Sequence, residues 1–493
     1  MKVGAKTLYP HQETAVRWMI RQEDEDIHGG FLCDDMGLGK TWTVLGLLSE
    51  TVADCPKTLL LCPLVVADQW LEAAAQANIN AYVYSKGHHW TRKHRAVCLE
   101  KGNKCATIYI ANYERIKENA STLTEFDRLV IDEAHILRNQ ASERYNKIYN
   151  LAKEIPRTWC LTGTPLVNRV ADVEALYRLI RGNRLESTIG DFPKACELFR
   201  SYAIGRSMED VGMPLGERPT DTEVILDFDT TEEAEFYRLI QGQIARQMTL
   251  FEELDASNNA EVFKLLLRLR QISIHPQVYI QGQRRSHGRN YGRTDWTGRS
   301  STKVAALRRI IECSQVSHNW VVFCNFQDEI ELLRKELAGS RCIGAVETYH
   351  GAKDVGQRAA DLAMYKQACA CNTHVSYSEL CGLFPGLPDD VCGIIGGYLG
   401  PVHNVLLVQI HCGGTGLNLQ ENDRVVFMSP WWTSALMKQA VGRVYRMGQK
   451  KPVAVYRLML KEEASLNIDR KMMDKAQSKE ELCAGLLACC VKG

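Results

Sequence analysis

The chain has 493 residues, of which 45% are hydrophobic and 24% charged, with 36 Gly and 14 Pro. This composition excludes collagen-like, low-complexity and largely disordered chains, and the length favours about three domains. The 60 Lys and Arg against 59 Asp and Glu leave a net charge of +1. A protein that holds nucleic acid by being basic all over is excluded, so any such site would be a local groove.

The 18 cysteines are scattered along the chain, several of them within apolar runs. A secreted disulfide framework concentrates its cysteines in a short chain, so we expect reduced, buried thiols. The first residues contain no apolar signal-peptide segment, and no window reaches about 18 uninterrupted apolar residues. We therefore expect a soluble intracellular protein, in nucleus, cytoplasm or viral factory, without a membrane partner.

In chain order, residues 30–165 alternate short β-rich runs with helical patterns, which predicts βαβ units and a parallel sheet. The expected strands are 30–33, 58–62, 81–84, 107–111, 129–131 and 158–161, with helices at 42–50 and 68–78. Residues 166–295 are expected to be mostly helical, over 173–180, 231–251 and 260–274. A second alternation has strands at 321–323, 405–410, 424–428 and 453–458 and a helix at 328–337.

The sequence thus predicts an α/β protein with two parallel-sheet lobes. We expect lobe 1 at 1–165, a helical insertion with a basic linker at 166–295, lobe 2 at 296–460 and a C-terminal helical brace at 461–493. An insert at 369–403 interrupts lobe 2, and its cysteines and His374 have irregular spacing for zinc. This insert either packs on the lobe or docks a protein partner. The basic segment 284–303 is either a DNA-contacting loop or a solvated linker.

A glycine-rich segment, Asp34 to Thr41, follows the first apolar run and precedes a helical pattern. Gly37 and Gly39 would let backbone N–H groups surround a phosphate at a helix N-terminus. Lys40 could then reach the β and γ oxygens, and the Thr41 hydroxyl could bind Mg²⁺. The alternative is a glycine turn before a helix, because Asp34 stands where a strict phosphate-loop pattern has its first glycine.

A second segment, Asp132-Glu133-Ala134-His135, directly follows a buried apolar run. A carboxylate at the end of a strand can hold Mg²⁺, and Glu133 next to it can orient and deprotonate an attacking water. An acidic helix N-cap is the alternative, which the phosphate loop about 90 residues upstream makes the weaker interpretation.

The third segment, Gln439 to Gln449, places Arg443 and Arg446 three residues apart on one predicted helix face. Two guanidinium groups that reach a γ-phosphate from the second lobe would stabilise transition-state charge as arginine fingers. A solvated basic helix face is the alternative interpretation.

Together these segments resemble the Snf2 (Swi2/Snf2) family, a branch of the superfamily 2 helicase-like ATPases. Asp34 to Thr41 is similar to the family's D-E-M-G-L-G-K-T sequence, and Asp132 to His135 to its DEAH box; Asp35 replaces the usual Glu. Further similar segments are Leu8 to Gln12, Leu60 to Pro63, Ala111 to Glu114, Leu161 to Pro165, Leu269 to Pro276, Val321 to Phe326, Gly413 to Gln420 and Ser429 to Trp432. So compact a chain resembles prokaryotic and large-DNA-virus members.

The resemblance implies two RecA-like lobes with Snf2-type helical insertions, and ATP with Mg²⁺ between the lobes. The implied nucleotide-binding residues are Gln12, which would read adenine, and Asp34, Asp35, Met36, Gly37, Leu38, Gly39, Lys40 and Thr41, with Thr41 and Asp132 as metal ligands. The implied catalytic residues are Lys40, Asp132, Glu133, Gln439, Arg443 and Arg446. The partner would be duplex DNA with little sequence preference, contacted by Asn112, Thr162, Thr164, Gly414, Thr415, Asn418 and Trp432.

We therefore expect an ATP-hydrolysing motor that moves along duplex DNA without separating its strands. Three alternatives share these motifs: a strand-separating helicase, a DNA-dependent ATPase acting on RNA polymerase, and a scaffold that uses nucleotide only as a switch. The scaffold would need a broken catalytic set, whereas Lys40, Asp132, Glu133 and both arginines are present.

Overall fold

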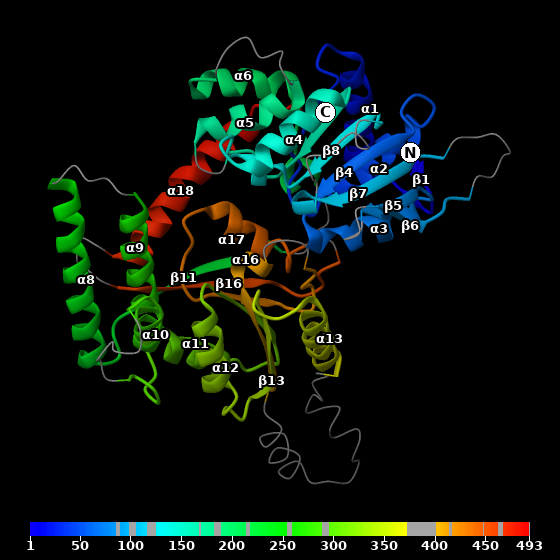
Figure 1. Cartoon of the computed structure of the whole chain (residues 1–493). Coiled ribbons are helices and arrows are strands. Elements are labelled where there is room, and N and C mark those ends of the chain that lie inside the picture. Colours follow the sequence, from blue (N-terminus) through cyan, green and yellow to red (C-terminus); the bar gives the residue numbers. More distant parts are fainter. Residues whose placement is uncertain are drawn as a thin grey trace, which may run out of the picture.

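The computed structural model contains two parallel-sheet lobes, one above the other in Figure 1. It describes residues 1–84, 89–97, 105–115, 125–166, 169–181, 189–212, 217–253, 259–287, 295–371, 401–413, 417–446, 448–461 and 467–492. The expected insert at 369–403 therefore lies almost wholly outside the described residues, as does the expected phosphate contact at Gly414 and Thr415. The α/β architecture with two parallel sheets confirms the expected fold class.

The first sheet has the strand order β10-β3-β9-β8-β4-β7-β5-β6, and every neighbouring pair is parallel except β5 with β6. Its strands are β3 (Gly29–Leu32), β4 (Lys57–Cys62), β5 (Asn80–Tyr84), β6 (Trp90–His94), β7 (Thr107–Asn112), β8 (Arg128–Asp132), β9 (Arg157–Leu161) and β10 (Ala203–Ile204). A small antiparallel pair, β1 (Lys2–Val3) and β2 (Lys6–Thr7), precedes it.

Helices cover both faces of this sheet, as its continuous apolar strands require. Leu59 and Leu61 point to one face and Leu60 to the other, so one strand feeds two separate cores. Helices α1 (Pro10–Asp24), α2 (Lys40–Glu50) and α3 (Ala67–Gln76) pack on the Leu60 face. Helices α4 (Glu143–Glu154), α5 (Val170–Arg181) and α6 (Phe192–Tyr202) pack on the other.

The second sheet is parallel throughout, in the order β11-β16-β15-β12-β14-β13. Its strands are β11 (Thr220–Leu226), β12 (Asn319–Cys324), β13 (Ile343–Tyr349), β14 (His403–Gln409), β15 (Arg424–Phe427) and β16 (Ala454–Leu460). Helices α11 (Thr302–Glu312) and α12 (Gln327–Leu337) cover one face. On the other face lie α13 (Val355–Cys371) and α17 (Ser434–Val441), and the short α16 (Ile410–Gly413) follows β14.

The segment expected as a helical insertion, 166–295, does not form one separate unit. Its first part packs on lobe 1 through α5 and α6 and adds β10 beside β3. After the short α7 (Met208–Val211), β11 pairs with β16 along all seven residues and so belongs to lobe 2. Only α8 (Thr231–Glu253), α9 (Asn259–Ile274) and α10 (Pro276–His287) form a helical part, which stands beside the second sheet in Figure 1.

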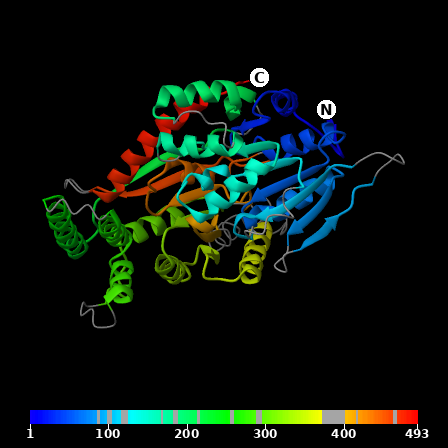
Figure 2. The same ribbon diagram turned by 45° about the horizontal axis from the view of Figure 1, so that its top comes forward.

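The long C-terminal helix α18 (Ile468–Leu487) connects all three parts, as Figures 1 and 2 show. It contacts β16 and α17 of lobe 2, α9 of the helical part and α6 of lobe 1. The residues that follow it return to the first sheet, where the Val491 N–H donates to the Ala203 carbonyl at 2.9 Å and its carbonyl accepts from Gly205 N–H at 3.0 Å.

Most described cysteines are unpaired thiols within the cores, such as Cys33, Cys160 and Cys324. Cys105 is disulfide-bonded, so the expectation of reduced thiols throughout is wrong at that position. Among the described helices, none combines the length and the apolar character that crossing a membrane requires.

Candidate functional site

The segment Asp34 to Thr41 forms a loop between β3 and the first turn of α2. Gly37 and Gly39 adopt φ values of 90° and 78°, in the left-handed region that favours glycine. A Cβ on Gly39 would lie 2.5 Å from Gln12 Nε2, so only glycine fits there. The loop thus places backbone N–H groups at the N-terminus of α2, where an anion is favoured.

Two side chains of α1 form hydrogen bonds to the backbone of this loop. Gln12 is fully buried and donates from Nε2 to the Leu38 carbonyl at 3.0 Å, while its Oε1 accepts from Tyr9 N–H at 3.0 Å. His11 Nε2 also lies 3.0 Å from the Leu38 carbonyl oxygen. The Gln12 amide therefore bonds to the protein at both ends and acts here by positioning the loop.

Asp34, at the first glycine position of a strict phosphate loop, is buried and forms a two-pronged ion pair with Arg206. Arg206 Nε lies 2.9 Å from Oδ1 and Nη2 lies 2.7 Å from Oδ2. The Asp34 backbone carbonyl accepts from Lys40 Nζ at 2.7 Å. Asp34 therefore fixes the loop's entry, while its carbonyl orients the lysine whose charge would meet a phosphate.

Asp132 lies at the carboxyl end of β8 and is held by two donors. Its Oδ2 accepts from Trp70 Nε1 and its Oδ1 from the Glu133 N–H, at 2.8 and 2.9 Å. Burial, together with the Glu133 charge, raises the pKa of Asp132 to about 6. Each carboxylate oxygen accepts one hydrogen bond from the described residues, so lone pairs remain for a cation.

Glu133 adopts a left-handed backbone conformation, with φ 52° and ψ 45°. A non-glycine residue there carries strain that the surrounding structure must impose, and such strain clusters at functional sites. The conformation turns the Glu133 side chain to His135, whose Nδ1 lies 3.3 Å from Oε2. His135 in turn lies 3.4 Å from the Thr162 hydroxyl at the end of β9, which links two neighbouring strand ends.

Arg443 and Arg446 do not share a helix face, contrary to the expectation. Helix α17 ends at Val441 and is capped by Gly442, after which the chain continues in turns. The turn is fixed because the Arg443 carbonyl accepts from Leu419 N–H at 3.0 Å, which pulls the chain away from the helix axis. Both arginines nevertheless lie where lobe 2 meets lobe 1.

The two lobes meet at this turn. Arg443 is buried, and its Nη2 lies 4.0 Å from Glu133 Oε1. A Cβ on Gly37 would lie 3.9 Å from Arg446 Cβ, so the second arginine stands over the phosphate loop. Burial lowers the pKa of both guanidinium groups. Arg443 of lobe 2 thus lies close to Glu133 of lobe 1, and Arg446 lies close to the phosphate loop.

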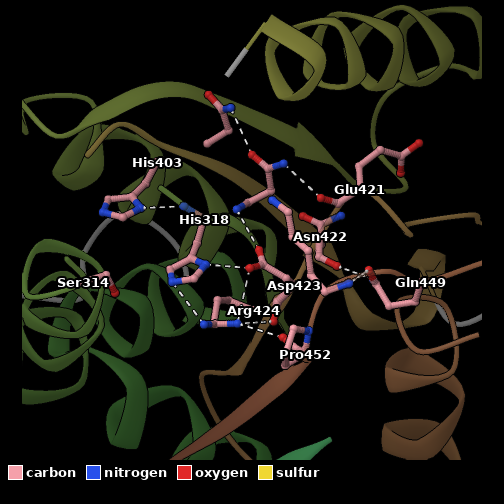
Figure 3. Close-up of polar contacts among 12 residues, drawn as sticks. Ser314, His318, His403, Glu421, Asn422, Asp423, Arg424, Gln449 and Pro452 are labelled. Carbon is pink, nitrogen blue, oxygen red and sulfur yellow. Dashed lines mark hydrogen bonds and ion pairs between the residues drawn. The ribbon is translucent and has the colours of Figure 1, made fainter. Parts of the chain in front are cut away.

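Gln449 fixes the end of the turn that carries Arg443 and Arg446 through hydrogen bonds. It lies at the edge of the network drawn in Figure 3. Its Nε2 donates to the carbonyls of Gln420 and Asn422 at 3.1 and 2.9 Å, and to Val444 at 3.2 Å. Asp423, which follows Asn422 in the chain, accepts a hydrogen bond from Asn319 N–H at 3.1 Å and forms an ion pair with His318 at 2.6 Å. The arginine turn is therefore anchored to the amino ends of the central strands.

The side chains expected to contact DNA lie in different surroundings. Thr162 is fully buried, and its hydroxyl accepts from Thr164 N–H at 3.1 Å, so it links site residues rather than reaching a solvent-facing phosphate. The Asn112 side chain bonds to Cys62 O and Glu114 N at the end of β7. Asn418 caps a turn through Gln420 N, whereas Trp432 lines a groove between the lobes, next to Gln439.

Two functional residues, Arg206 and Trp70, have no signal in the sequence, and Tyr113, although inside the family-similar segment Ala111 to Glu114, is not among the predicted site residues. Arg206 is 172 positions from Asp34, and Trp70 is 62 positions from Asp132. Tyr113, whose hydroxyl donates to the Asp132 carbonyl, is 19 positions from it. Such partners come together only through the fold: β10 lies beside β3, which brings Arg206 to Asp34, and β8, β4 and β7 lie side by side near Asp132.

Comparison with known proteins extends over the whole chain. The family described as "SNF2-related domain" matches residues 11–278, and the family described as "Helicase conserved C-terminal domain" matches residues 401–448. A "Probable global transactivator" of Orgyia pseudotsugata multicapsid polyhedrosis virus is 25% identical, over 97% of this chain and 91% of the relative. An uncharacterized ATP-dependent helicase of Mycoplasma genitalium is 24% identical over 96% of this chain.

The chain spans 42% of that Mycoplasma relative and 67% of an ATP-dependent helicase of Schizosaccharomyces pombe, to which it is 22% identical. Among solved structures, the SWI2/SNF2 ATPase core of Sulfolobus solfataricus in complex with dsDNA is 20% identical. The match covers 98% of this chain and 97% of that chain, with a TM-score of 0.39.

Proposed function

Because this chain belongs to the SNF2-related family of helicase-like ATPases, we propose that it hydrolyses ATP between its lobes to move along duplex DNA. The observation that carries the proposal is the approach of Arg443 Nη2 to Glu133 Oε1 across the cleft, at 4.0 Å. An ATPase site that closes only when both lobes meet can couple each hydrolysis cycle to a change in the distance between them. In this proposal the lobes follow the sheets, with lobe 1 ending after β10 and lobe 2 beginning at β11.

The lobe 1 residues fit a magnesium–nucleotide complex. Mg²⁺ prefers oxygen ligands and usually takes one or two carboxylates, with substrate phosphates and water completing its shell. Asp132 and the Thr41 hydroxyl supply such oxygens beside the phosphate loop, and Trp70 and the Glu133 N–H hold the carboxylate in place. When bound, the ion would neutralise charge on the phosphates.

The remaining site residues would each have a separate role in hydrolysis. Glu133, next to Asp132, would accept a proton from the attacking water, and its strained backbone fixes the direction of its carboxylate. Lys40 would bind the phosphates from the loop. Arg443 and Arg446 would stabilise the charge that develops on the transferred phosphoryl group, which is where an arginine finger contributes most.

The test is the steady-state ATPase rate of the full chain with no nucleic acid, duplex DNA, single-stranded DNA or RNA, with Glu133→Gln as the blank. Stimulation by duplex DNA, without unwinding of a tailed duplex, is the expected result. Stimulation by single strands or RNA alone would contradict the proposal and make a strand-separating helicase the leading interpretation.

A second candidate function is a DNA-dependent ATPase that acts on RNA polymerase. The relative named as a transactivator supports it, because the chain spans 91% of that protein. The insert 369–403 is the proposed contact, and it lies almost wholly outside the described residues. Co-purification with a viral or cellular RNA polymerase, lost when the insert is deleted, is the expected result for this candidate.

A further inference from the structure

A groove of about 870 Å³ lies between the lobes, next to the ATPase residues and separate from the phosphate loop. Lobe 1 contributes His135 and Arg138, and the helical part contributes Phe263. Lobe 2 contributes Trp431 and Trp432, and α18 forms the remaining wall. Because its walls come from every part of the molecule, the groove has this shape only when the lobes are together.

The α18 wall presents three lysines to the groove: Lys471, Lys475 and Lys479. Residues four apart lie on one helix face, about 6 Å apart along the axis. Arg138 of lobe 1 faces them, and the pKa of Lys479 is lowered by burial and also by the charges of Lys475 and Arg138, although the charge of Asp172 acts in the opposite direction. Several cations therefore converge on one space.

Acidic side chains do not offset this charge within the groove. Its only carboxylate among the described residues, Asp474, pairs with Arg470 Nε at 3.3 Å. Arg138, Lys471 and Lys475 form no ion pair within the described ranges. By contrast, Lys438 on the neighbouring α17 is paired with Glu480 at 2.6 Å. Three cations without an ion-pair partner among the described residues, Arg138, Lys471 and Lys475, therefore meet at a concave surface, which indicates an anionic ligand.

Three aromatic side chains, Phe263, Trp431 and Trp432, also line the groove. Arg270 stacks over the Trp431 ring at 4.2 Å, and the His411 ring meets its edge at 4.6 Å, so this indole is held rigidly. Phe263 is 55% exposed, which is unusual for a phenylalanine and leaves a ring face available. An exposed aromatic ring beside a row of cations is a combination that binds a nucleic-acid strand, with a base or sugar on the ring and phosphates on the lysines.

We propose that α18 is part of the DNA-binding surface, and that Lys471, Lys475 and Lys479 bind backbone phosphates of one strand lying in this groove. The inference rests on the proposed function, since it adds a contact to the same DNA path. It also gives α18 a role beyond packing: a helix joined to both lobes would hold the strand at their boundary. The groove takes one strand, either as the edge of a duplex or as a separate strand.

The test compares the full-length wild type with Lys471→Gln/Lys475→Gln/Lys479→Gln. Binding of fluorescent duplex and single-stranded DNA is measured from low to high salt. Each phosphate contact contributes about 0.9 to the slope of log K against log salt for duplex and about 0.7 for single strands. We expect the slope of the triple variant to fall by about 2 to 3, with affinity at low salt lowered at least about tenfold.

Two further variants keep the result interpretable. Lys471→Arg/Lys475→Arg/Lys479→Arg retains the charges and should retain the wild-type slope. Lys335→Gln, an exposed lysine on α12 away from the groove, should bind DNA as the wild type does. If the glutamine variant unfolds at lower temperature, the slopes are compared at a temperature at which both proteins are folded: a fall of about 2 to 3 supports the proposal, and an unchanged slope overturns it.

The outcomes separate this inference from the proposed function. A wild type whose ATPase no DNA stimulates would overturn the proposed function itself. A wild type that duplex DNA stimulates, with an unchanged slope in the glutamine variant on both DNA forms, would overturn only the groove. A slope change confined to duplex or to single strands supports the groove and identifies which of the two it holds.

Discussion

Arg206 and Asp34 form a buried, two-pronged ion pair between residues 172 positions apart. Arg206 also donates from Nη1 to the His11 carbonyl at 2.5 Å, so one guanidinium joins α1, the phosphate loop and the segment after β10. The acidic residue at the loop's first position is therefore a structural anchor. It replaces the conformational freedom of a glycine with a fixed electrostatic contact.

Replacing Arg206 with alanine should lower the free energy of unfolding by about 3–5 kcal/mol, because the Asp34 carboxylate would remain buried without its partner. Chemical denaturation measures the effect. Arg308→Ala is the control, because it removes a largely exposed i,i+4 pair with Glu312 and should cost about 0–1 kcal/mol. Equal losses in the two variants would show that the buried pair contributes no more than the surface one.

Replacing Glu133 with glutamine should leave ATP binding intact and abolish turnover, because the amide cannot accept the proton of the attacking water. Binding of a fluorescent ATP analogue and phosphate release are the two measurements. Turnover at the wild-type rate would remove Glu133 from the role of general base.

Replacing Arg446 with alanine should lower kcat about 10³-fold or more, with ATP affinity little changed, as expected for a charge that acts in the transition state. Steady-state kinetics with saturating DNA separates kcat from KM. A variant that only binds ATP more weakly would instead show that Arg446 contacts the bound substrate.

Replacing Trp70 with phenylalanine keeps an aromatic ring in the core but removes the indole N–H that bonds to Asp132. We expect the Mg²⁺ concentration for half-maximal ATPase activity to rise about tenfold, the lower range for loss of an outer ligand contact. Trp159→Phe is the control, because it also removes a buried indole–carboxylate bond, to Glu23 Oε1 at 2.8 Å, outside the site. The same Mg²⁺ dependence in both variants would argue against a positioning role for Trp70.

Glu329 makes the stability of lobe 2 depend on pH. Burial raises its pKa to about 7, although the N–H groups of Asn325 and Phe326 and the charges of Arg270 and Lys303 act in the opposite direction. Since the folded pKa lies above the unfolded one, its contribution to stability is complete below about pH 4.5 and is lost as pH rises through about 7.

The measurement is the free energy of unfolding of wild type and Glu329→Gln at several pH values. The stability of the wild type relative to the variant should fall by about 3 kcal/mol between pH 4.5 and 8, from about 1.36 kcal/mol per pKa unit. A difference between the two proteins that does not change with pH would contradict the raised pKa.

Local sequence patterns located the phosphate loop and the Asp132–His135 segment better than they located the edge strands around them. The strands β3 and β8 are short apolar runs; β3 ends at Leu32, just before Asp34, and β8 ends at Asp132, so the motifs and their sheet could be placed together. β10 is only two residues long, and β11 has the polar sequence TDTEVIL, exposed along much of its length, so neither resembles a buried strand. Both segments form strands because β3 and β16 offer them backbone hydrogen bonds. A local sequence pattern does not indicate such a partner.

The arginine turn was mispredicted for a similar reason. Its residues have good helix periodicity, and α17 indeed covers the first part of the motif. The helix stops because Gln449 and the Arg443 carbonyl bond to the segment around Gln420, which comes from elsewhere in lobe 2. A tertiary contact here outweighs the local preference.

The chain joins the lobes twice, between β10 and β11 and again along α18, whose end returns to β10. Two connections restrict the relative motion of the lobes more than a single linker would. Both lie toward the β10 and β11 edges of the sheets, and β6 and β13 form the opposite edges. Separation of the lobes is therefore least constrained at the β6 and β13 edges.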